Sequence, residues 1–401
     1  MKKLLFYCQH ILGMGHLVRS MEIVRSLTAN FEVCFINGGE VIQGFQAPPN
    51  IRIANIPAIK TDPEFQALLP VDPTLDIEKT KALRKEQILS ILADFQPDVL
   101  MVELFPFGRR RFSFELIPLI EAAKAQQAKV VSSLRDIIVT KSNQARHEAK
   151  VICLLNQYFD LLLIHGDPTL HTLEESFSRI SDVECNLQYT GYVTQTPESS
   201  HITIADRVNL SRSEPMIVVS VGGGRFGHDL LECVVATAEK LERRLPHHIQ
   251  MFTGPFFPEE KFWRLKAIER DRHNLSIHRY TPNLLAYMQK ADLSISMSGY
   301  NTTMNILSTG VKAMMMPFSG NGDQEQTMRV KRLAQLGRVR QIQAEDLQPE
   351  RLAEVIIAYL QSSSGALQID LNGAEKTAEI IRGLAANPLE KRDASVRVFA
   401  Q

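Results

Sequence analysis

A histidine follows two glycines directly after the first apolar segment of this 401-residue chain. Leu4 to Cys8 has the character of a short buried strand, and Gly13, Gly15 and His16 come after it. The apolar spacing from Leu17 to Leu27 predicts a helix, which places His16 at a helix N-terminus. The helix dipole there disfavours an imidazolium ion, so a neutral imidazole able to act as a general base is expected. A histidine that only caps the turn would show the same pattern.

Two glycine-containing turns follow apolar strands in the second half of the chain. The first turn is Gly222, Gly223, Gly224 and Arg225, and the second is Ser298, Gly299, Tyr300, Asn301 and Thr302. Glycine lets the backbone approach a ligand closely, and a helix that begins after such a turn offers free N–H groups to an anion. We therefore predict a phosphate site at these turns, with Arg225 neutralising the anion. A triple glycine in an ordinary tight turn is the alternative for the first.

A carboxylate also ends one strand of the first half. Asp136 follows Ser132 to Arg135 at the end of an apolar segment. It would orient His16, accept a hydrogen bond from a substrate hydroxyl or act as the base itself. Capping of a helix, or pairing with Arg135, explains it equally well.

The segment from Ala291 to Gln326 resembles the donor half of GT-B glycosyltransferases. The resemblance is to the family that includes the N-acetylglucosaminyltransferase completing the peptidoglycan lipid precursor. The matching elements are, in order, Ala291-Asp292, Ser298-Gly299, Gly310, Pro317-Phe318 and Asp323-Gln324-Glu325-Gln326. This resemblance implies an α/β protein of the GT-B fold, in which two Rossmann-like open parallel-sheet domains face a central cleft.

The resemblance also implies roles for residues on the donor side. Tyr280 would stack on the nucleobase and Thr281 would offer backbone hydrogen bonds, although a core tyrosine is the alternative for Tyr280. The resemblance also implies a uridine diphosphate sugar as the donor. Asn305 stands where the family has a Glu that bridges the ribose hydroxyls, and an Asn can donate and accept there as a neutral partner. The loop residues that would read the donor sugar, or else form an ordinary polar surface loop, are Gln324, Glu325 and Gln326. We place Gly13 and Gly15 at the donor site as well.

The first loop carries a second resemblance. Its form, Gly13-x-Gly15-His16-x-x-Arg19, is similar to that of nucleotide-sugar hydrolases of nonulosonic-acid biosynthesis. In those enzymes the histidine activates water, whereas in the transferases its position lies near the acceptor hydroxyl. On its acceptor side the peptidoglycan enzyme has a His-Glu-Gln-Asn stretch, whereas this chain has Arg135-Asp136 at that place. The difference argues against the same acceptor. We expect inverting glycosyl transfer, with nucleotide-sugar hydrolysis or epimerisation, or a non-catalytic nucleotide-sugar-binding protein, as alternatives.

Strand and helix patterns alternate twice along the chain, which predicts two domains with parallel sheets. The boundaries that we expect are 1–195 for an acceptor-side domain, 205–375 for a donor-binding domain, and 376–401 for a final helix and tail that cross back. The polar run between Val193 and Glu214 reads as the linker.

The composition narrows the possible partners. Lys plus Arg and Asp plus Glu both number 45, so a general nucleic-acid-binding surface is not expected. No run of 18 apolar residues occurs, and the five Cys show no CxxC spacing, so we expect a cytoplasmic protein. No Asp-x-Asp is evident, and we predict neither a metal nor a cofactor. Phe105 to Arg111 mixes apolar and basic residues and would contact a membrane or a lipid-linked acceptor, or else form a solvated loop with inward aromatics.

Overall fold

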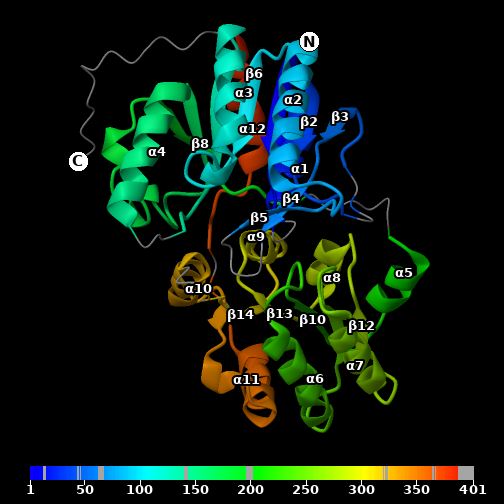
Figure 1. Cartoon of the computed structure of the whole chain (residues 1–401). Helices are drawn as coiled ribbons and strands as arrows, with labels where there is room; N and C mark the ends of the chain where they lie inside the picture. Colours follow the sequence, from blue (N-terminus) through cyan, green and yellow to red (C-terminus); the bar gives the residue numbers. More distant parts are fainter. Residues whose placement is uncertain are drawn as a thin grey trace, which may run out of the picture.

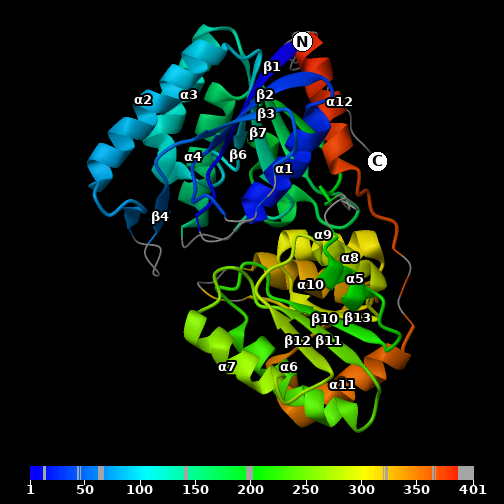
Figure 2. The same cartoon turned by 90° about the vertical axis from the view of Figure 1, so that its right-hand side faces the viewer.

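The computed structural model describes residues 1–11, 15–42, 45, 47–61, 67–139, 143–195, 202–318, 320, 324–363, 365 and 367–386. Two α/β domains lie one above the other in Figures 1 and 2. Gly13, Asp323 and the tail after Ala386 lie outside the described residues. None of the described helices is long and apolar enough to cross a membrane.

The N-domain contains a seven-stranded sheet in the order β3-β2-β1-β6-β7-β8-β9, with every pair parallel. Its strands are β1 (Lys2–Cys8), β2 (Phe31–Asn37), β3 (Ile51–Asn55), β6 (Val99–Glu103), β7 (Lys129–Arg135), β8 (Leu161–His165) and β9 (Asn186–Tyr189). Its helices are α1 (Gly15–Leu27), α2 (Ile77–Phe95), α3 (Ser113–Ala125) and α4 (Gln144–Tyr158). A small antiparallel pair, β4 (Ile59–Thr61) and β5 (Leu68–Pro70), stands apart from the main sheet.

The C-domain repeats this plan with a six-stranded parallel sheet in the order β12-β11-β10-β13-β14-β15. Its strands are β10 (Met216–Ser220), β11 (His248–Phe252), β12 (Leu275–His278), β13 (Leu293–Met297), β14 (Ala313–Met316) and β15 (Arg340–Gln341). Its helices are α5 (Ile204–Leu210), α6 (His228–Glu242), α7 (Glu259–Glu269), α8 (Leu284–Lys290), α9 (Tyr300–Thr309), α10 (Glu325–Gln335) and α11 (Pro349–Gln361).

Each sheet is covered on both faces, which is why its central strands are continuously apolar. In the N-domain, α2, α3 and α4 pack on one face, and α1 packs on the other together with the last helix, α12 (Gly373–Ala386). Figure 2 shows α12, in red, beside α1. The chain therefore returns to the N-domain after the C-domain, and Ile381 is buried in the same apolar cluster as Leu17.

One segment differs from expectation in local structure, and a second agrees with one of the two alternatives given for it. The polar run that reads as a linker contains α5, whose N-terminus is capped by Thr203 and Asp206 in a reciprocal capping box. In the segment from Phe105 to Arg111, the rings of Phe105 and Phe107 are buried in the N-domain core. These rings are therefore not available to enter a membrane, and the structure favours the loop with inward aromatics.

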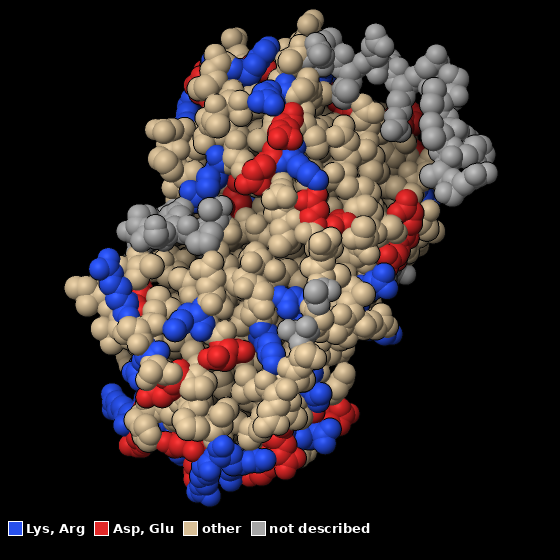
Figure 3. Space-filling model, turned by 180° about the vertical axis from the view of Figure 1, so that it is seen from behind, with Lys and Arg blue, Asp and Glu red and all other residues tan. Residues whose placement is uncertain are grey.

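The strand order fixes where a ligand can bind. β1 lies between β2 and β6, and β10 lies between β11 and β13. The strand order therefore reverses beside β1 and beside β10, which gives each sheet a topological switch point. Ligands of open parallel sheets bind at the carboxyl ends of the strands at such a point. On the face shown in Figure 3, basic and acidic side chains are interspersed, in keeping with a formal net charge of zero.

Candidate functional site

A cavity of about 490 Å³ lies between the two domains at these strand ends. Its N-domain wall comes from α1 and the end of β7, and its C-domain wall comes from α8, α9 and the loops after β10 and β12. Residues of the predicted site that line it are Gly15, His16, Gly222, Gly223, Tyr280, Thr281, Gly299, Tyr300, Asn301, Thr302, Asn305 and Gln326. The structure therefore brings most of the predicted donor site together with His16.

His16 is held by a carboxylate that ends the neighbouring strand. Its Nδ1 lies 2.6 Å from Oε1 of Glu103, the last residue of β6, and Arg19 donates to the same oxygen. An ionised carboxylate only accepts hydrogen bonds, so Nδ1 must carry the proton and donate it. Nε2 is then the free acceptor of a neutral ring, which is the form that a general base requires.

The charges around this pair are consistent with that protonation state. Burial lowers the pKa of His16 to about 3, despite the opposing charge of Glu103. Burial by itself would raise the pKa of Glu103, but the charges of His16 and Arg19 outweigh it and lower that pKa to about 2. Near neutral pH the pair is therefore an imidazole beside a carboxylate, and a proton taken up by His16 would be stabilised by Glu103.

On the opposite wall, two glycines leave open space. A Cβ placed on Gly222 or Gly299 would meet no heavy atom within 4 Å. Gly299 is the N-cap of α9, so the free N–H groups of that helix open onto the same space. Gly224 differs, because a Cβ there would lie 2.4 Å from the carbonyl oxygen of Thr253. Gly222 and Gly299 thus leave open space in the cavity, whereas the missing side chain of Gly224 allows two loops to pack.

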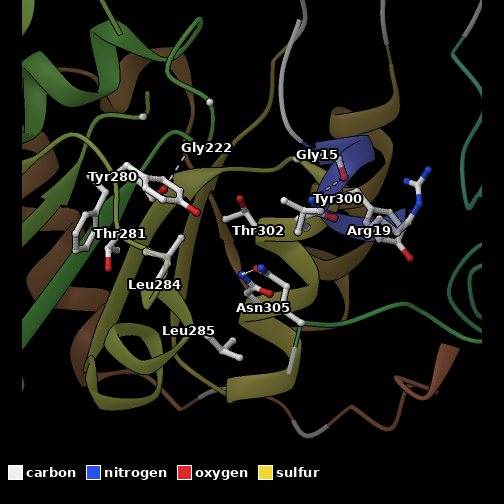
Figure 4. A pocket seen from close by; sticks show the side chains of 18 of the residues that line it. Gly15, Arg19, Gly222, Tyr280, Thr281, Leu284, Leu285, Tyr300, Thr302 and Asn305 are labelled. Carbon is white, nitrogen blue, oxygen red and sulfur yellow. Dashed lines mark hydrogen bonds between the residues drawn. The ribbon is translucent and has the colours of Figure 1, made fainter. Parts of the chain in front are cut away.

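The remaining part of the cavity offers an apolar face and one unpaired acceptor. Figure 4 shows Tyr280 and Leu284 on one side and Asn305 on α9 between Leu285 and Thr302. Asn305 Nδ2 donates to Gln195 Oε1 at 2.7 Å, while Asn305 Oδ1 is buried without a hydrogen-bond partner among the described residues. A buried acceptor of this kind is costly unless a ligand donates to it.

The other two predicted catalytic residues, Asp136 and Arg225, lie outside the cavity. Asp136 is fully buried and accepts two hydrogen bonds from the Arg329 guanidinium, at 2.7 and 3.1 Å. It does not contact His16, whose partner is Glu103. Both oxygens of Asp136 are occupied by a cation and hidden from the cavity, so we do not carry it forward as a base or as the residue that orients His16. Arg225 is exposed, with its guanidinium 4.5 Å from the ring centroid of Phe256, and does not line the cavity.

The predicted sugar-reading loop is divided between two roles. Gln326 lines the cavity and accepts a hydrogen bond from the backbone of Phe318, and Ser298 donates to it. Glu325 is buried and pairs with Arg135 of the N-domain at 2.6 Å and with Arg329 at 2.9 Å. Gln324 is exposed at the N-cap of α10 and does not line the cavity. Of the three residues, only Gln326 is positioned to contact a donor directly.

Sequence reasoning missed Glu103, Arg19 and Gln195 as site residues. A signal for Glu103 was present, because it is the only charged residue within an otherwise apolar strand and stands at its carboxyl end. Arg19 follows His16 by one helical turn and so shares its face. Gln195 gave no signal, because its position depends on how the interdomain connection crosses the C-domain. Among the described residues, no group of three or more His, Cys, Asp or Glu side chains is arranged to hold a metal ion.

Comparison with known proteins finds relatives of part of the chain and solved structures similar to both domains. Residues 216–381 match the family model of the glycosyltransferase family 28 C-terminal domain. UDP-N-acetylglucosamine--N-acetylmuramyl-(pentapeptide) pyrophosphoryl-undecaprenol N-acetylglucosamine transferases are among the curated relatives. That of Rhodopseudomonas palustris is 26% identical over 47% of this chain and 53% of its own, and that of Haemophilus influenzae is 28% identical over 43% and 49%. The chain thus spans about half the length of the curated relatives that it matches.

Solved structures extend the likeness to both domains. Acinetobacter baumannii MurG superimposes with a TM-score of 0.57 at 14% identity, over 96% of this chain and all of that one. The UDP-GlcNAc 2-epimerase from Methanocaldococcus jannaschii gives a TM-score of 0.62 at 11% identity, with coverage of 96% and 100%. The expected GT-B fold is confirmed, and so is the resemblance to the family of the peptidoglycan N-acetylglucosaminyltransferase.

Proposed function

We propose that this chain, whose second half matches a glycosyltransferase family 28 C-terminal domain, transfers a sugar from a nucleotide diphosphate sugar to an acceptor hydroxyl with inversion. One observation carries the proposal. The His16–Glu103 pair of one domain and the open N-terminus of α9 of the other face a single cavity. A base and an anion site on opposite walls are what an in-line displacement at an anomeric carbon requires.

In this mechanism His16 Nε2 takes the proton of the acceptor hydroxyl as its oxygen attacks the anomeric carbon. The bond from that carbon to the diphosphate oxygen breaks, and the electron pair leaves with the diphosphate. The N–H groups at the start of α9 and the Gly222 turn stabilise the charge that develops there, which is the main electrostatic task. Glu103 stabilises the imidazolium ion that forms.

The donor is proposed to be a uridine nucleotide. Tyr280 and Leu284 give the base an apolar face, and Asn305, which lines the cavity on α9, would hydrogen-bond a ribose hydroxyl after a rotation of its side chain. Asn305 lies five residues after the start of α9, about 7.5 Å along the helix axis, which suits the separation of a ribose from its β-phosphate.

The acceptor is proposed by analogy with the curated relatives, whose names describe a pyrophosphoryl-undecaprenol-linked acceptor. We therefore propose a lipid-linked hydroxyl compound of the cell envelope, reached by a protein at the inner face of the membrane. Metal independence belongs to the same proposal, because the helix N-terminus would supply the positive charge.

The test begins with calorimetric binding of nucleoside diphosphates and their sugars to the full chain. We expect binding of one nucleotide diphosphate, with affinity unchanged by EDTA, and then transfer to a lipid-linked acceptor with inverted anomeric configuration in the product. Release of the sugar to water with every acceptor tried would instead identify a nucleotide-sugar hydrolase. If the chain binds none of these nucleotides, it shares only the fold of the glycosyltransferases, and the proposal is wrong.

A further inference from the structure

Tyr300 connects the two domains beside the cavity. It is the first residue of α9 in the C-domain and is only 5% exposed. Its hydroxyl donates to the carbonyl oxygen of His165 at 3.1 Å and accepts from the N–H of Val193 at 3.0 Å, both in the N-domain. The hydroxyl is therefore committed to protein contacts, and the ring is held at a fixed place between the domains.

The ring of Tyr300 contacts the side chain that shares the carboxylate of Glu103. The guanidinium carbon of Arg19 lies 5.2 Å from the ring centroid, and Figure 4 shows the two side chains next to each other. The same guanidinium donates to Glu103 Oε1, the oxygen that receives Nδ1 of His16. A continuous series of contacts thus runs from a C-domain aromatic ring to the proposed base of the N-domain.

These contacts have a chemical consequence. A guanidinium over an aromatic face is attracted to the ring electrons, which helps to keep Arg19 on Glu103. While Arg19 stays there, it neutralises part of the carboxylate charge and competes with His16 for one oxygen. The position of Arg19 therefore determines both the orientation of the imidazole and how strongly Glu103 favours its protonated form.

We propose that Tyr300 is a positioning residue for His16, acting through the guanidinium of Arg19. Tyr300 belongs to α9, the helix whose N-terminus would bind the donor. His16 would therefore be held in its catalytic orientation only when the two domains are arranged to form the donor site. The catalytic meaning of this inference rests on the proposed function, whereas the effect of Tyr300 on His16 does not.

The charged groups that face His16 come from several elements. They are Glu103 at the end of β6, Arg19 on α1, Arg109 in the segment after β6, and Arg135 at the end of β7. Among these, Arg19 contacts the ring of Tyr300. Loss of the ring would free Arg19 to leave Glu103, whose charge would then act on His16 with less compensation. The pKa of His16 is therefore expected to rise.

The experiment is an NMR pH titration of the histidine side chains, with the His16 signal assigned by its loss in His16→Gln. The variants are Tyr300→Leu, which removes the ring, and Tyr300→Phe, which keeps the ring but removes the hydroxyl. Arg19→Gln tests the same contact from α1 in case Tyr300→Leu does not fold. Tyr192→Phe is the packing control, because its ring centroid lies 6.0 Å from that of Tyr300 and its hydroxyl has no hydrogen-bond partner among the described residues.

The expected result is a His16 midpoint about one pKa unit or more higher in Tyr300→Leu and Arg19→Gln than in the wild type. Tyr300→Phe and Tyr192→Phe should titrate like the wild type. The proposal is wrong if His16 stays neutral across the folded range in Tyr300→Leu and Arg19→Gln, or if Tyr300→Phe shifts as far as they do. Because no substrate is used, these outcomes are independent of nucleotide binding, whose absence would overturn the proposed function alone.

Once a donor and an acceptor are known, kinetics give a second reading. A positioning role predicts that Tyr300→Leu lowers kcat about tenfold or more, while the KM for the donor changes less than threefold. A purely structural loss of the site would raise the donor KM together with the fall in kcat. That second pattern would contradict the proposal.

Discussion

At the scale of single residues, the site depends on a neutral imidazole beside an ionised carboxylate. His16 is buried enough to lose its proton, and its side chain keeps 19% of its surface exposed to the cavity. Glu103 has no exposed surface, yet it stays ionised because His16 donates a hydrogen bond to it and the positive charge of Arg19 lies beside it. His16 therefore presents a reactive lone pair to the cavity, and Glu103 provides a buried negative charge behind it.

The role of His16 predicts the effect of its removal. His16→Ala should lower kcat about 100-fold or more, since positioned general bases contribute 10²–10⁴, and should leave nucleotide affinity within about twofold. Turnover and calorimetric binding measure the two quantities. His273→Gln is the matched control, because the side chain of His273 is 87% exposed. Near-normal turnover in His16→Ala would show that His16 is not the base.

At the scale of elements, the helix α9 and its N-cap provide several of the C-domain residues that line the cavity. Its N-cap Gly299 opens onto the cavity, Asn301 donates to the carbonyl oxygen of Gly15 at 2.9 Å, and Asn305 faces the predicted ribose. In the proposed complex one helix would therefore contact the donor at two points, and the same helix contacts the first loop of the other domain. The position of α9 depends on β13, because Gly299 follows the carboxyl end of that strand by two residues.

The open space at Gly299 predicts a separation of binding from stability. Gly299 has φ −64°, which any residue adopts, and no heavy atom lies within 4 Å of a Cβ placed there. Gly299→Ala should therefore keep its stability within about 1 kcal/mol of the wild type, because the loss of a favourable N-cap residue opposes the entropic gain, but its methyl group would occupy the place of the phosphate and weaken nucleotide binding about tenfold or more. Gly383→Ala on α12 is the control for binding, since its Cβ also meets no heavy atom within 4 Å. Unchanged nucleotide affinity in Gly299→Ala would show that the diphosphate does not bind at the N-terminus of α9.

The contact between β7 and α10 predicts a large effect on stability. Asp136 and Arg329 are both fully buried, so replacing one leaves the other charge without its partner. Asp136→Asn should lower the free energy of unfolding by about 3–5 kcal/mol, as measured by urea denaturation. Glu350→Gln, in the exposed pair with Lys240, should change it by less than about 1 kcal/mol. Equal effects of the two substitutions would show that burial of the Asp136–Arg329 pair does not matter.

At the scale of the whole molecule, several histidines are buried in the neutral form. Burial is the main cause in each case, and it lowers the pKa of His16 and His165 to about 3 and that of His10 and His248 to about 4. Each folded-state pKa lies below the unfolded value of about 6.5. Below that value the unfolded chain binds protons that the folded chain does not, so stability falls as the pH falls.

This linkage predicts that the free energy of unfolding is constant between about pH 7 and about pH 8 and decreases between about pH 6.5 and about pH 3. His165→Gln should make the decrease smaller by about 1 kcal/mol or more, because one buried neutral imidazole is gone. Denaturation at a series of pH values measures the slope. His273→Gln, at an exposed position, should leave the slope as in the wild type. A wild-type stability that does not fall over this range would contradict the neutral state of the buried histidines.

Much of this architecture could be predicted from the sequence because its signals are local. Apolar strands, helical spacing and Gly-rich turns depend on neighbouring residues, and the expected alternation of strands and helices agrees with both sheets. The short strands β4, β5, β9 and β15 and the helices α5 and α8 were not predicted, since each is only a few residues long, and α7 was not predicted either. Their formation depends on pairing or packing with distant segments, not on a periodic pattern.

The sequence by itself determined the two parallel-sheet domains, the turns at their strand ends, and the residue types gathered there. It left open which side chains meet, because contacts across a sheet or between domains depend on strand order and domain placement. Tertiary structure therefore decided that Glu103, not Asp136, holds His16, since β6 and not β7 lies beside β1. It also placed Glu325 and Tyr300 in contacts between the domains, because only the packed molecule brings α9 and α10 against the N-domain.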